Sequence, residues 1–394
     1  MSRIVITGLG VISAIGNDLA ANHFALKEGK CGITDLEMFE SRYAGLLPSA
    51  EIKITTDELK DKLQIRDPGA TRTMLLALHA FEEAILDAGW EKSLLSAPDT
   101  AFIGACTVGG MCLTDELFSD AHKTSGGSAF LASYDCGSVG LFLQNQFSLT
   151  GVVNTINTAC SSSANTIMYG ARLIKNGFAK RCIVGGVDSL AKYTINGFNA
   201  LHILSNEVCT PFDQDRNGLN LGEGAAFLVL EKEEDAMGNI YGELSGYFNA
   251  NDSFHPSTLS ETGDGPLLAM KGALRSARLS PEDIGYINAH GTGTENNDEV
   301  ESKTMLQVFG EPPAFASTKS NTGHTLGAAG AIEAAFSLLN LYNQELYPSL
   351  HFNQPIASTG LVPVVKYQRK SLDHVMSNSF GFGGNCTSLI FSKA

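Results

Sequence analysis

A pattern that occurs twice constrains the fold of this chain more than any other feature of the sequence. In the first half, the β-branched run 152–157 leads through the small residues 158–163 into a segment whose apolar residues recur at helical spacing. In the second half, the strand-like run 314–319 leads in the same way into the small-residue helical segment 326–339. Strands that alternate with helices in both halves predict an α/β fold with a mostly parallel sheet, duplicated within the chain.

The length of the chain, 394 residues, allows either two separate domain-sized cores or two halves built on one continuous sheet. Charged residues crowd together at 231–235, and we expect the seam between the halves there, although a solvated helix end would explain the same local pattern. The predicted division is therefore 1–235 and 236–394.

The charge balance and the cysteine pattern exclude several classes of protein. The sequence has 42 acidic against 27 basic residues, which argues against a nucleic acid or an anionic membrane bound through a general positive field. Its 8 cysteines are scattered without a C-x-x-C pair or other metal-ligand spacing, so neither a zinc site nor a disulfide framework is predicted. Because no secretory leader and no apolar run of membrane-spanning length is recognisable, we expect a soluble cytoplasmic protein in a reducing compartment.

Cys160 lies at the corner where the strand of the first half meets its helix. Unpaired amide N–H groups and the positive end of the helix dipole meet at such a corner, which favours a thiolate and can lower a cysteine pKa to roughly 3.5–7.5. For a cysteine taken alone, a small buried residue that packs the helix against the sheet is the more common explanation. Other residues must decide between a nucleophile and a packing residue.

Three residues of the second half are candidate partners for Cys160. His290 follows the strand-like run 286–289, and Lys319 and His324 lie at the start of the second-half helix. Each has an ordinary alternative, as a structural histidine or a surface lysine. Ligands of α/β sheets gather outside the carboxyl ends of strands, where all these residues fall, so they would converge if the halves pack about a pseudo-twofold axis.

A thiolate, two imidazoles and an ammonium together suit acyl transfer to carbon better than hydrolysis. A thiolate accepts an acyl group, and two histidines that donate Nε2–H groups to one oxygen stabilise the enolate formed when decarboxylation produces a carbon nucleophile. The glycine loop at Phe382 would add a backbone N–H to that of Cys160 at an oxyanion. A hydrolytic triad needs one histidine and an orienting group, and would leave Lys319 and the second histidine without a role.

Four motifs, in order and over essentially the whole chain, resemble those of the elongating β-ketoacyl-acyl-carrier-protein synthases of the thiolase superfamily. They are NTACSS at 157–162, NAHGTGT at 288–294, STKSNTGHTLGAAG at 317–330 and NSFGFGG at 378–384. The resemblance implies a thiolase-like fold of α-β-α-β-α layers, with two halves related by a pseudo-twofold axis. It places the nucleophilic cysteine in 1–235 and the His/Lys/His set in 236–394.

By this resemblance, Cys160 takes the acyl chain from acyl-carrier protein, and His290 and His324 promote decarboxylation of malonyl-acyl-carrier protein. The carbanion then attacks the acyl thioester and gives a 3-oxoacyl product. Lys319 is similar to the family lysine that orients the site and adjusts its electrostatics. No cofactor is implied, because both groups arrive on the phosphopantetheine of the carrier protein.

The same resemblance implies supporting roles for further residues. Phe382 would be a mobile gate and an oxyanion donor, and Thr292 and Thr294 would contact the pantetheine arm. Val108 and Phe198 would line an acyl pocket, and Glu301 would be a buried acid near Lys319. A structural monovalent-cation site is implied near Asn288, Glu333 and Asn378. No catalytic metal is implied.

Two segments depart from the family pattern. The short segment 205–211 lacks the arginine that many members place near the carrier-protein entrance. The docking patch is therefore open, with candidates at Arg66, Arg72, Lys175, Lys180 and Arg181. The loop 218–224 resembles synthases of bacterial polyene pathways more than the common fatty-acid form, which implies an unsaturated or aryl-capped chain.

Three related classes of protein are alternatives to this enzyme. A non-catalytic chain-length partner subunit of a heterodimeric ketosynthase loses the nucleophile, whereas this chain has Cys160, His290 and His324. Starter-unit synthases pair cysteine with histidine and asparagine. Thiolases use a second cysteine near the C-terminus, but Cys386 lies inside a predicted strand and is expected to be structural. We expect a homodimer, or a heterodimer with a related subunit, and no nucleic-acid or membrane partner.

Overall fold

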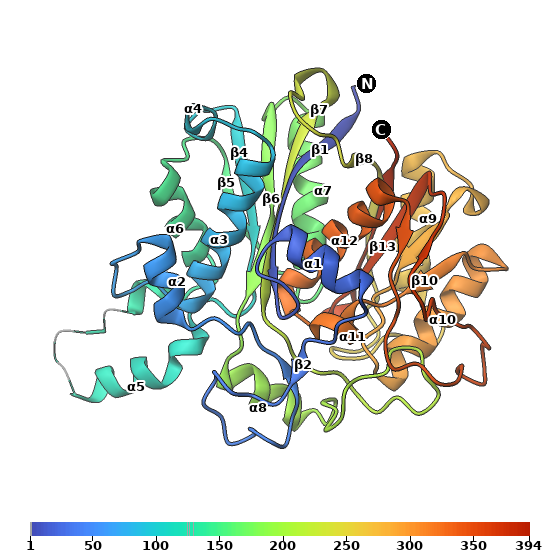
Figure 1. The fold of residues 1–394 in the computed structure, drawn as a ribbon, viewed down its shortest axis with the longest axis horizontal. Coiled ribbons are helices and arrows are strands. Elements are labelled where there is room, and N and C mark those ends of the chain that lie inside the picture. Colours follow the sequence, from blue (N-terminus) through green and yellow to red (C-terminus); the bar gives the residue numbers. More distant parts are fainter. Residues whose placement is uncertain (1, 124, 126, 129) are drawn as a thin grey trace.

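The computed structural model describes every residue of the chain except 1, 124, 126 and 129. Its centre is one ten-stranded sheet, visible in Figure 1. The strands of the first half are β1 (Ile4–Ser13), β4 (Thr100–Ala105), β5 (Val153–Ile156), β6 (Arg181–Asp188) and β7 (Gly224–Lys232). Those of the second half are β8 (Gly242–Asn251), β9 (Tyr286–Asn288), β10 (Ala314–Ala316), β13 (His374–Phe380) and β14 (Asn385–Ser392).

The order of the strands shows the duplication directly. Across the sheet it is β10-β9-β13-β14-β8-β1-β7-β6-β4-β5. Counted in chain order within each half, both halves run third, second, fourth, fifth and first from the sheet edge to the centre, where β1 and β8 pair antiparallel. Two equivalent halves therefore meet at a pseudo-twofold axis on one continuous sheet, and the predicted duplication is confirmed.

The prediction of a mostly parallel sheet is wrong. Of the nine neighbouring strand pairs, four are parallel, namely β4 with β5 and β6 and β9 with β10 and β13, and five are antiparallel. The connection from β13 to β14 is only residues 381–384, and so short a loop can join only antiparallel strands. Alternating strands and helices in the sequence do not reveal such hairpins.

Helices form three layers around the two halves of the sheet. Helix α3 (Arg72–Asp87) packs on β1 and β7, and α9 (Asp264–Ala277) packs on the equivalent strands β8 and β14. Helices α7 (Ser162–Lys175) and α12 (Ala329–Asn343) contact each other between the halves, and α12 touches both β7 and β13. Figure 1 shows α7 and α12 between the blue-green and the orange halves. The result is the expected α-β-α-β-α arrangement.

The central layer explains the small-residue composition of α12. Thirteen of its 15 residues are buried, as expected for a helix covered on all sides. Its start lies so close to α7 that a Cβ on Gly330 would come 2.7 Å from Ala164 N. Small side chains are therefore required where the two halves meet. Helices α7 and α12 begin next to each other there.

The remaining elements are shorter or lie outside these layers, and α11 among them is buried at the site. The helices are α1 (Leu19–Lys27), α2 (Thr56–Leu63), α4 (Lys92–Leu95), α5 (Thr114–Lys123), α6 (Ser138–Phe147), α8 (Lys192–Ala200), α10 (Glu295–Phe309) and α11 (Lys319–Thr322), and the short strands are β2 (Ile33–Thr34), β3 (Ser49–Ala50), β11 (Glu345–Leu346) and β12 (Gln368–Arg369). Helix α2 begins with a capping box between Thr55 and Glu58 but buries only Leu59, so its apolar pattern is too weak to be read from the sequence. Among the described residues, no helix combines the length and the apolar character needed to cross a membrane.

Candidate active site

Cys160 lies in a tight turn between β5 and α7. Ala159 before it has φ +54°, a left-handed conformation that residues with a Cβ rarely adopt. Ser162 Oγ stabilises the turn, because it accepts from Thr158 N at 2.8 Å and donates to Ala159 O at 2.5 Å. Asn157 Oδ1 accepts from Ala159 N at 3.2 Å. This strained but well-bonded turn places Cys160 at the wall of a cavity.

Cys160, His290 and His324 line one cavity of about 340 Å³. The three side chains are buried, and they form its inner end. His202 and His255 also line the cavity, but both are exposed to solvent. The cavity therefore leads from the surface to a buried site that contains one thiol and two imidazoles.

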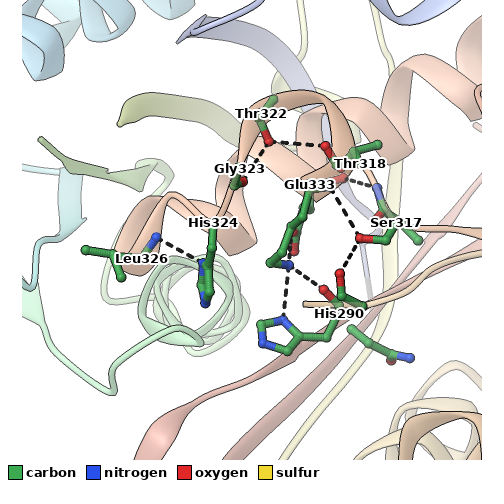
Figure 2. A network of polar contacts seen from close by, with 12 residues as sticks. His290, Ser317, Thr318, Thr322, Gly323, His324, Leu326 and Glu333 are labelled. Atoms are coloured by element: carbon green, nitrogen blue, oxygen red, sulfur yellow. Dashed lines mark hydrogen bonds and ion pairs between the residues drawn. The ribbon is translucent and has the colours of Figure 1, made fainter. Parts of the chain in front are cut away.

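The two histidines reach the cavity from different elements, His290 from the end of β9 and His324 from the loop after α11. Their ring centroids lie 5.5 Å apart with the ring planes at 85°. Figure 2 shows both side chains. His324 Nδ1 accepts a hydrogen bond from Leu326 N at 3.2 Å, and His290 Nδ1 lies 3.3 Å from Lys319 Nζ. A neutral imidazole that accepts at Nδ1 carries its proton on Nε2, so each ring has an N–H donor at Nε2.

Both imidazoles are neutral at physiological pH. Burial lowers the pKa of His290 well below its usual value, and the charge of Lys319 and the neighbouring His324 imidazole lower it further. Burial and the charge of Lys319 also lower the pKa of His324 well below its usual value. The two rings can therefore donate hydrogen bonds to one acceptor without repelling each other.

Lys319 is a cation buried behind His290. Its Nζ donates to His290 O at 2.6 Å and to Glu333 Oε1, so the lysine links β9 to α12. Burial raises the pKa of the Glu333 carboxyl to about 7, although the charge and the hydrogen bond of Lys319 oppose the rise. Glu333 and His290 are thus joined through this polar network, which Figure 2 shows.

Glu301 is buried near this network, as expected, but its carboxylate does not pair with Lys319. It accepts from the backbone N–H groups of His290 and Gly291, each at 2.9 Å, and from Asn378 Nδ2 at 3.2 Å. Burial raises the pKa of Glu301 to about 7. Glu301 therefore positions the backbone that carries His290, and Glu333 is the acid that pairs with the lysine.

Two side-chain oxygens of the residues expected to form a monovalent-cation site accept no hydrogen bond from the described residues. Among the described residues, neither Glu333 Oε2 nor Asn288 Oδ1 has a hydrogen-bond partner, although both are buried. Asn378 is fully bonded, because its Nδ2 donates to Glu301 and its Oδ1 accepts from Ser388 Oγ at 2.8 Å. No group of three or more His, Cys, Asp or Glu side chains in the described part of the chain is arranged to bind a metal ion.

The backbone N–H groups of Cys160 itself and of Phe382 lie close enough to the sulfur of Cys160 to lower the pKa of its thiol. These are the two donors predicted for an oxyanion. The predicted resting thiolate is wrong, because burial raises the pKa of the Cys160 thiol to about 11 and the Phe382 N–H and the charge of Lys319 only partly offset the rise. The sequence prediction included the helix dipole but not the cost of removing the thiolate from water.

Phe382 lies between β13 and β14, in the 3-10 helix Phe382–Gly384. Gly384 has φ +81°, and a Cβ at this position would come 1.7 Å from Asp252 O, so the loop requires glycine there. The Phe382 ring stacks on Phe198, with centroids 5.6 Å apart and planes at 15°. Both rings line the cavity beside Cys160.

Of the other residues predicted to contact substrate, some line the cavity and one does not. Thr292 and Thr294 line the cavity, with their hydroxyl oxygens 2.8 Å apart. Val108 is not among the residues that line it and is buried in an apolar cluster with Leu190, against which Phe198 packs. A role of Val108 in an acyl pocket stays a prediction.

Most of the docking candidates lie away from the cavity mouth. Arg72 is partly buried and forms an ion pair with the buried Glu223. Lys175, Lys180 and Arg181 lie at or beyond the far end of α7, whose 14 residues span roughly 20 Å from the Cys160 turn. A role of these four residues in docking the carrier protein stays a prediction.

The sequence did not predict the roles that two polar residues of the site, Glu333 and Arg216, have in the structure. Glu333 was assigned to a cation site rather than to Lys319, yet it is the single charged residue in the otherwise apolar helix α12, which is a recognisable signal of a buried partner. Arg216 has no such signal. It lies in a polar loop, and only the structure shows that it is buried against the residues of the cavity mouth.

Family comparisons cover most of the chain. The model described as Beta-ketoacyl synthase, N-terminal domain, matches residues 1–236, and that described as Beta-ketoacyl synthase, C-terminal domain, matches residues 241–353. A curated relative, 3-oxoacyl-[acyl-carrier-protein] synthase 2 of Vibrio cholerae, is 32% identical over 423 residues, covering 99% of this chain and 99% of the relative.

Solved structures agree with these matches. The ishigamide ketosynthase/chain length factor superposes with a TM-score of 0.93 at 27% identity, covering 100% of this chain and 99% of that chain. The ketosynthase (ApeO) in complex with its chain length factor (ApeC) from Xenorhabdus doucetiae gives a TM-score of 0.88 at 31% identity, covering 100% and 98%. The expected thiolase-like fold is confirmed.

Proposed function

The chain belongs to the β-ketoacyl synthase family, and on this premise we propose that it is an acyltransferase that condenses an acyl group on Cys160 with malonyl-acyl-carrier protein. Carbon dioxide is released, and the product is a 3-oxoacyl-acyl-carrier protein of a fatty-acid, polyene or polyketide chain. The proposal rests on one observation: a thiol and two neutral imidazoles with Nε2–H donors share the inner end of one cavity.

In the first step, the acyl group moves from the thioester of the carrier arm to Cys160 Sγ. The thiol is protonated at rest, and its proton leaves with the sulfur of the arm, so the exchange creates no net charge. The N–H groups of Cys160 and Phe382 lie at the sulfur and are placed to bind the thioester oxygen as it becomes an oxyanion.

In the second step, the malonyl group loses carbon dioxide. His290 and His324 each donate an Nε2–H to the malonyl thioester oxygen, and this stabilises the enolate in a buried site where hydrogen bonds are strong. The enolate carbon attacks the carbonyl of the acyl-Cys160 thioester, the bond to Sγ breaks, and the sulfur takes up a proton. Lys319 supports this step, because its charge adds to the effect of burial in keeping both imidazoles neutral and its Nζ positions His290.

Both groups arrive on the phosphopantetheine arm of the carrier protein, and no other cofactor enters the proposal. The hydroxyls of Thr292 and Thr294 line the cavity and are suitable partners for the amides of the arm. The partnerless oxygens of Glu333 and Asn288 fit a monovalent cation, which would supply positive charge beside the carboxylate. It would take no part in the bond changes.

We infer two protein partners, an acyl-carrier protein and a second ketosynthase-like subunit that is either a copy of this chain or a related one. Strand β5 supports the second, because it is the last strand of the sheet and one edge of its backbone is unpaired there. Exposed apolar side chains, Leu141 and Val152, accompany this edge. All eight cysteines are free thiols, in keeping with a reducing compartment such as the cytoplasm.

Cys160→Ala tests the proposed function. We expect this variant to fold, to accept no acyl group from acyl-carrier protein and to form no 3-oxoacyl product, as measured by mass spectrometry of the intact enzyme and of the carrier. Cys386→Ala is the matched control, because Cys386 is a buried cysteine in β14 outside the cavity and should keep both reactions. Undiminished condensation in Cys160→Ala would refute the proposal.

A further inference from the structure

Arg216 is a buried arginine beside the mouth of the cavity. Its side chain is only 4% exposed. Its guanidinium donates to three backbone carbonyls, Asp213 O at 2.9 Å, Thr294 O at 3.2 Å and Glu295 O at 2.8 Å. The Glu299 carboxylate is 4.0 Å away, beyond hydrogen-bonding distance. One planar fork therefore joins two chain segments that are far apart in sequence.

These two segments form one side of the cavity mouth. Asn217 and Gly218 line it from one segment, and Thr292 and Thr294 line it from the other. Gly218 N donates to Gly293 O at 3.0 Å, next to the contacts of the guanidinium. The mouth is therefore built from two loops that are bonded to each other through their backbones.

The threonine segment is also bonded from its other side. Asp298 accepts from Gly293 N at 3.1 Å and from Phe212 N at 2.7 Å. Because Asp298 and Arg216 both bind backbone groups, the hydroxyls of Thr292 and Thr294 are left to contact each other and the cavity.

Helix stability does not explain the position of Arg216. Thr294 is the N-cap of α10, and carbonyls at a helix start already accept from amides one turn later, as Thr294 O does from Asp298 N at 3.3 Å. A cation at a helix N-terminus is also unfavourable with respect to the helix dipole. The arginine therefore adds bonds that the helix does not need, and its charge is offset by the nearby carboxylates of Asp298 and Glu299.

We propose that Arg216 is a positioning residue that fixes Thr292 and Thr294 for the pantetheine arm. The assignment rests on the proposed function, because it concerns the substrate of the same cavity. Arg216 touches neither the thiol nor the imidazoles. It acts through the backbone of the segment that binds the arm, and its loss should weaken the recognition of the arm rather than the chemistry.

The test compares two thioesters that differ only in the length of the arm. The rate of acylation of Cys160 is measured with hexanoyl-pantetheine and with hexanoyl-N-acetylcysteamine, which lacks the part of the arm beyond the first amide. In Arg216→Lys the charge is kept, but the fork is lost. We expect the ratio of the two rate constants to fall by about tenfold, the equivalent of roughly one hydrogen bond.

Arg72→Lys is the matched control. Arg72 is a partly buried arginine that also donates to backbone carbonyls, Ile52 O at 2.9 Å and Ile54 O at 2.8 Å, but these residues do not line the cavity. This variant should lose stability and keep the wild-type ratio. Thr294→Val should lower the ratio in the wild-type background and change it little further in Arg216→Lys, because residues that act together are not additive.

A wild-type ratio in Arg216→Lys, with a loss of stability like that of Arg72→Lys, would overturn the assignment and leave Arg216 a purely structural residue. Fully additive effects of Arg216→Lys and Thr294→Val would overturn it as well. If wild-type Cys160 reacts with neither thioester, the proposed function fails, and this assignment fails with it. The three results are distinguishable, because only the last one changes the wild-type enzyme.

Discussion

Alkylation of Cys160 by iodoacetamide should become faster with each step in pH up to about pH 10. Only the thiolate reacts, and burial raises the pKa of this thiol to about 11. Below the pKa, the thiolate fraction rises tenfold for each pH unit. An ordinary cysteine has a pKa of about 8.5, so at neutral pH Cys160 should contain roughly 300-fold less thiolate, equivalent to about 3 kcal/mol.

The assay is timed alkylation between about pH 6.5 and 9.5, followed by peptide mapping, so that each cysteine is measured separately. Cys136 is an internal control in the same sample. It is half-buried, and its hydrogen bond with Cys106 lowers its pKa, so its rate should level off at a lower pH than that of Cys160. The fold is monitored by circular dichroism over the same range.

A second variant separates the contributions to the thiol pKa. Lys319→Met combined with Glu333→Gln removes the buried cation without leaving its carboxylate unpaired. The charge of Lys319 lowers the pKa of Cys160 more than the charge of Glu333 raises it, so the loss of both should make alkylation slower still. A wild-type rate that levels off near about pH 8 would refute the reasoning, because the helix dipole and Lys319 would then outweigh burial.

Two further variants divide the reaction into its steps. Cys160→Gln should keep the decarboxylation of malonyl-acyl-carrier protein, measured as released carbon dioxide, because both imidazoles and the backbone N–H donors remain. The absence of carbon dioxide release would contradict the assignment of this step to the histidines. The double change His290→Ala and His324→Ala should abolish decarboxylation while Cys160 is still acylated, as detected by intact mass. Decarboxylation at the wild-type rate in the double variant would count against the two-donor mechanism.

The electrostatic arrangement explains why the thiol and the two imidazoles stay uncharged until the substrates bind. The thiol is protonated, the two imidazoles are neutral and the buried cation Lys319 is paired with Glu333. Charge is needed only when the enolate forms, and the donors for its oxygen are then already in place. Such donors are most effective where water is excluded, and burial also accounts for the shifts of the three pKa values.

The local features of the site could be predicted from the sequence. The strand-to-helix corner at Cys160, the histidine after β9 and the glycine loop at Phe382 each depend on a short run of residues with its own turn chemistry. The division at 231–235 stays a prediction, since the two halves share one sheet through β1 and β8. The repeated strand-and-helix pattern was sufficient for the duplicated fold, because each unit must bury its apolar face against the other.

The sequence by itself determined which reactive groups the chain has and that two similar halves carry them. Only the tertiary structure decided how they interact. It paired Lys319 with Glu333, bonded Glu301 to the backbone at His290, and buried Arg216 against the mouth of the cavity. It also reversed the expected shift of the Cys160 pKa, because the helix dipole is a local property that can be read from sequence, whereas desolvation depends on every segment packed around the sulfur.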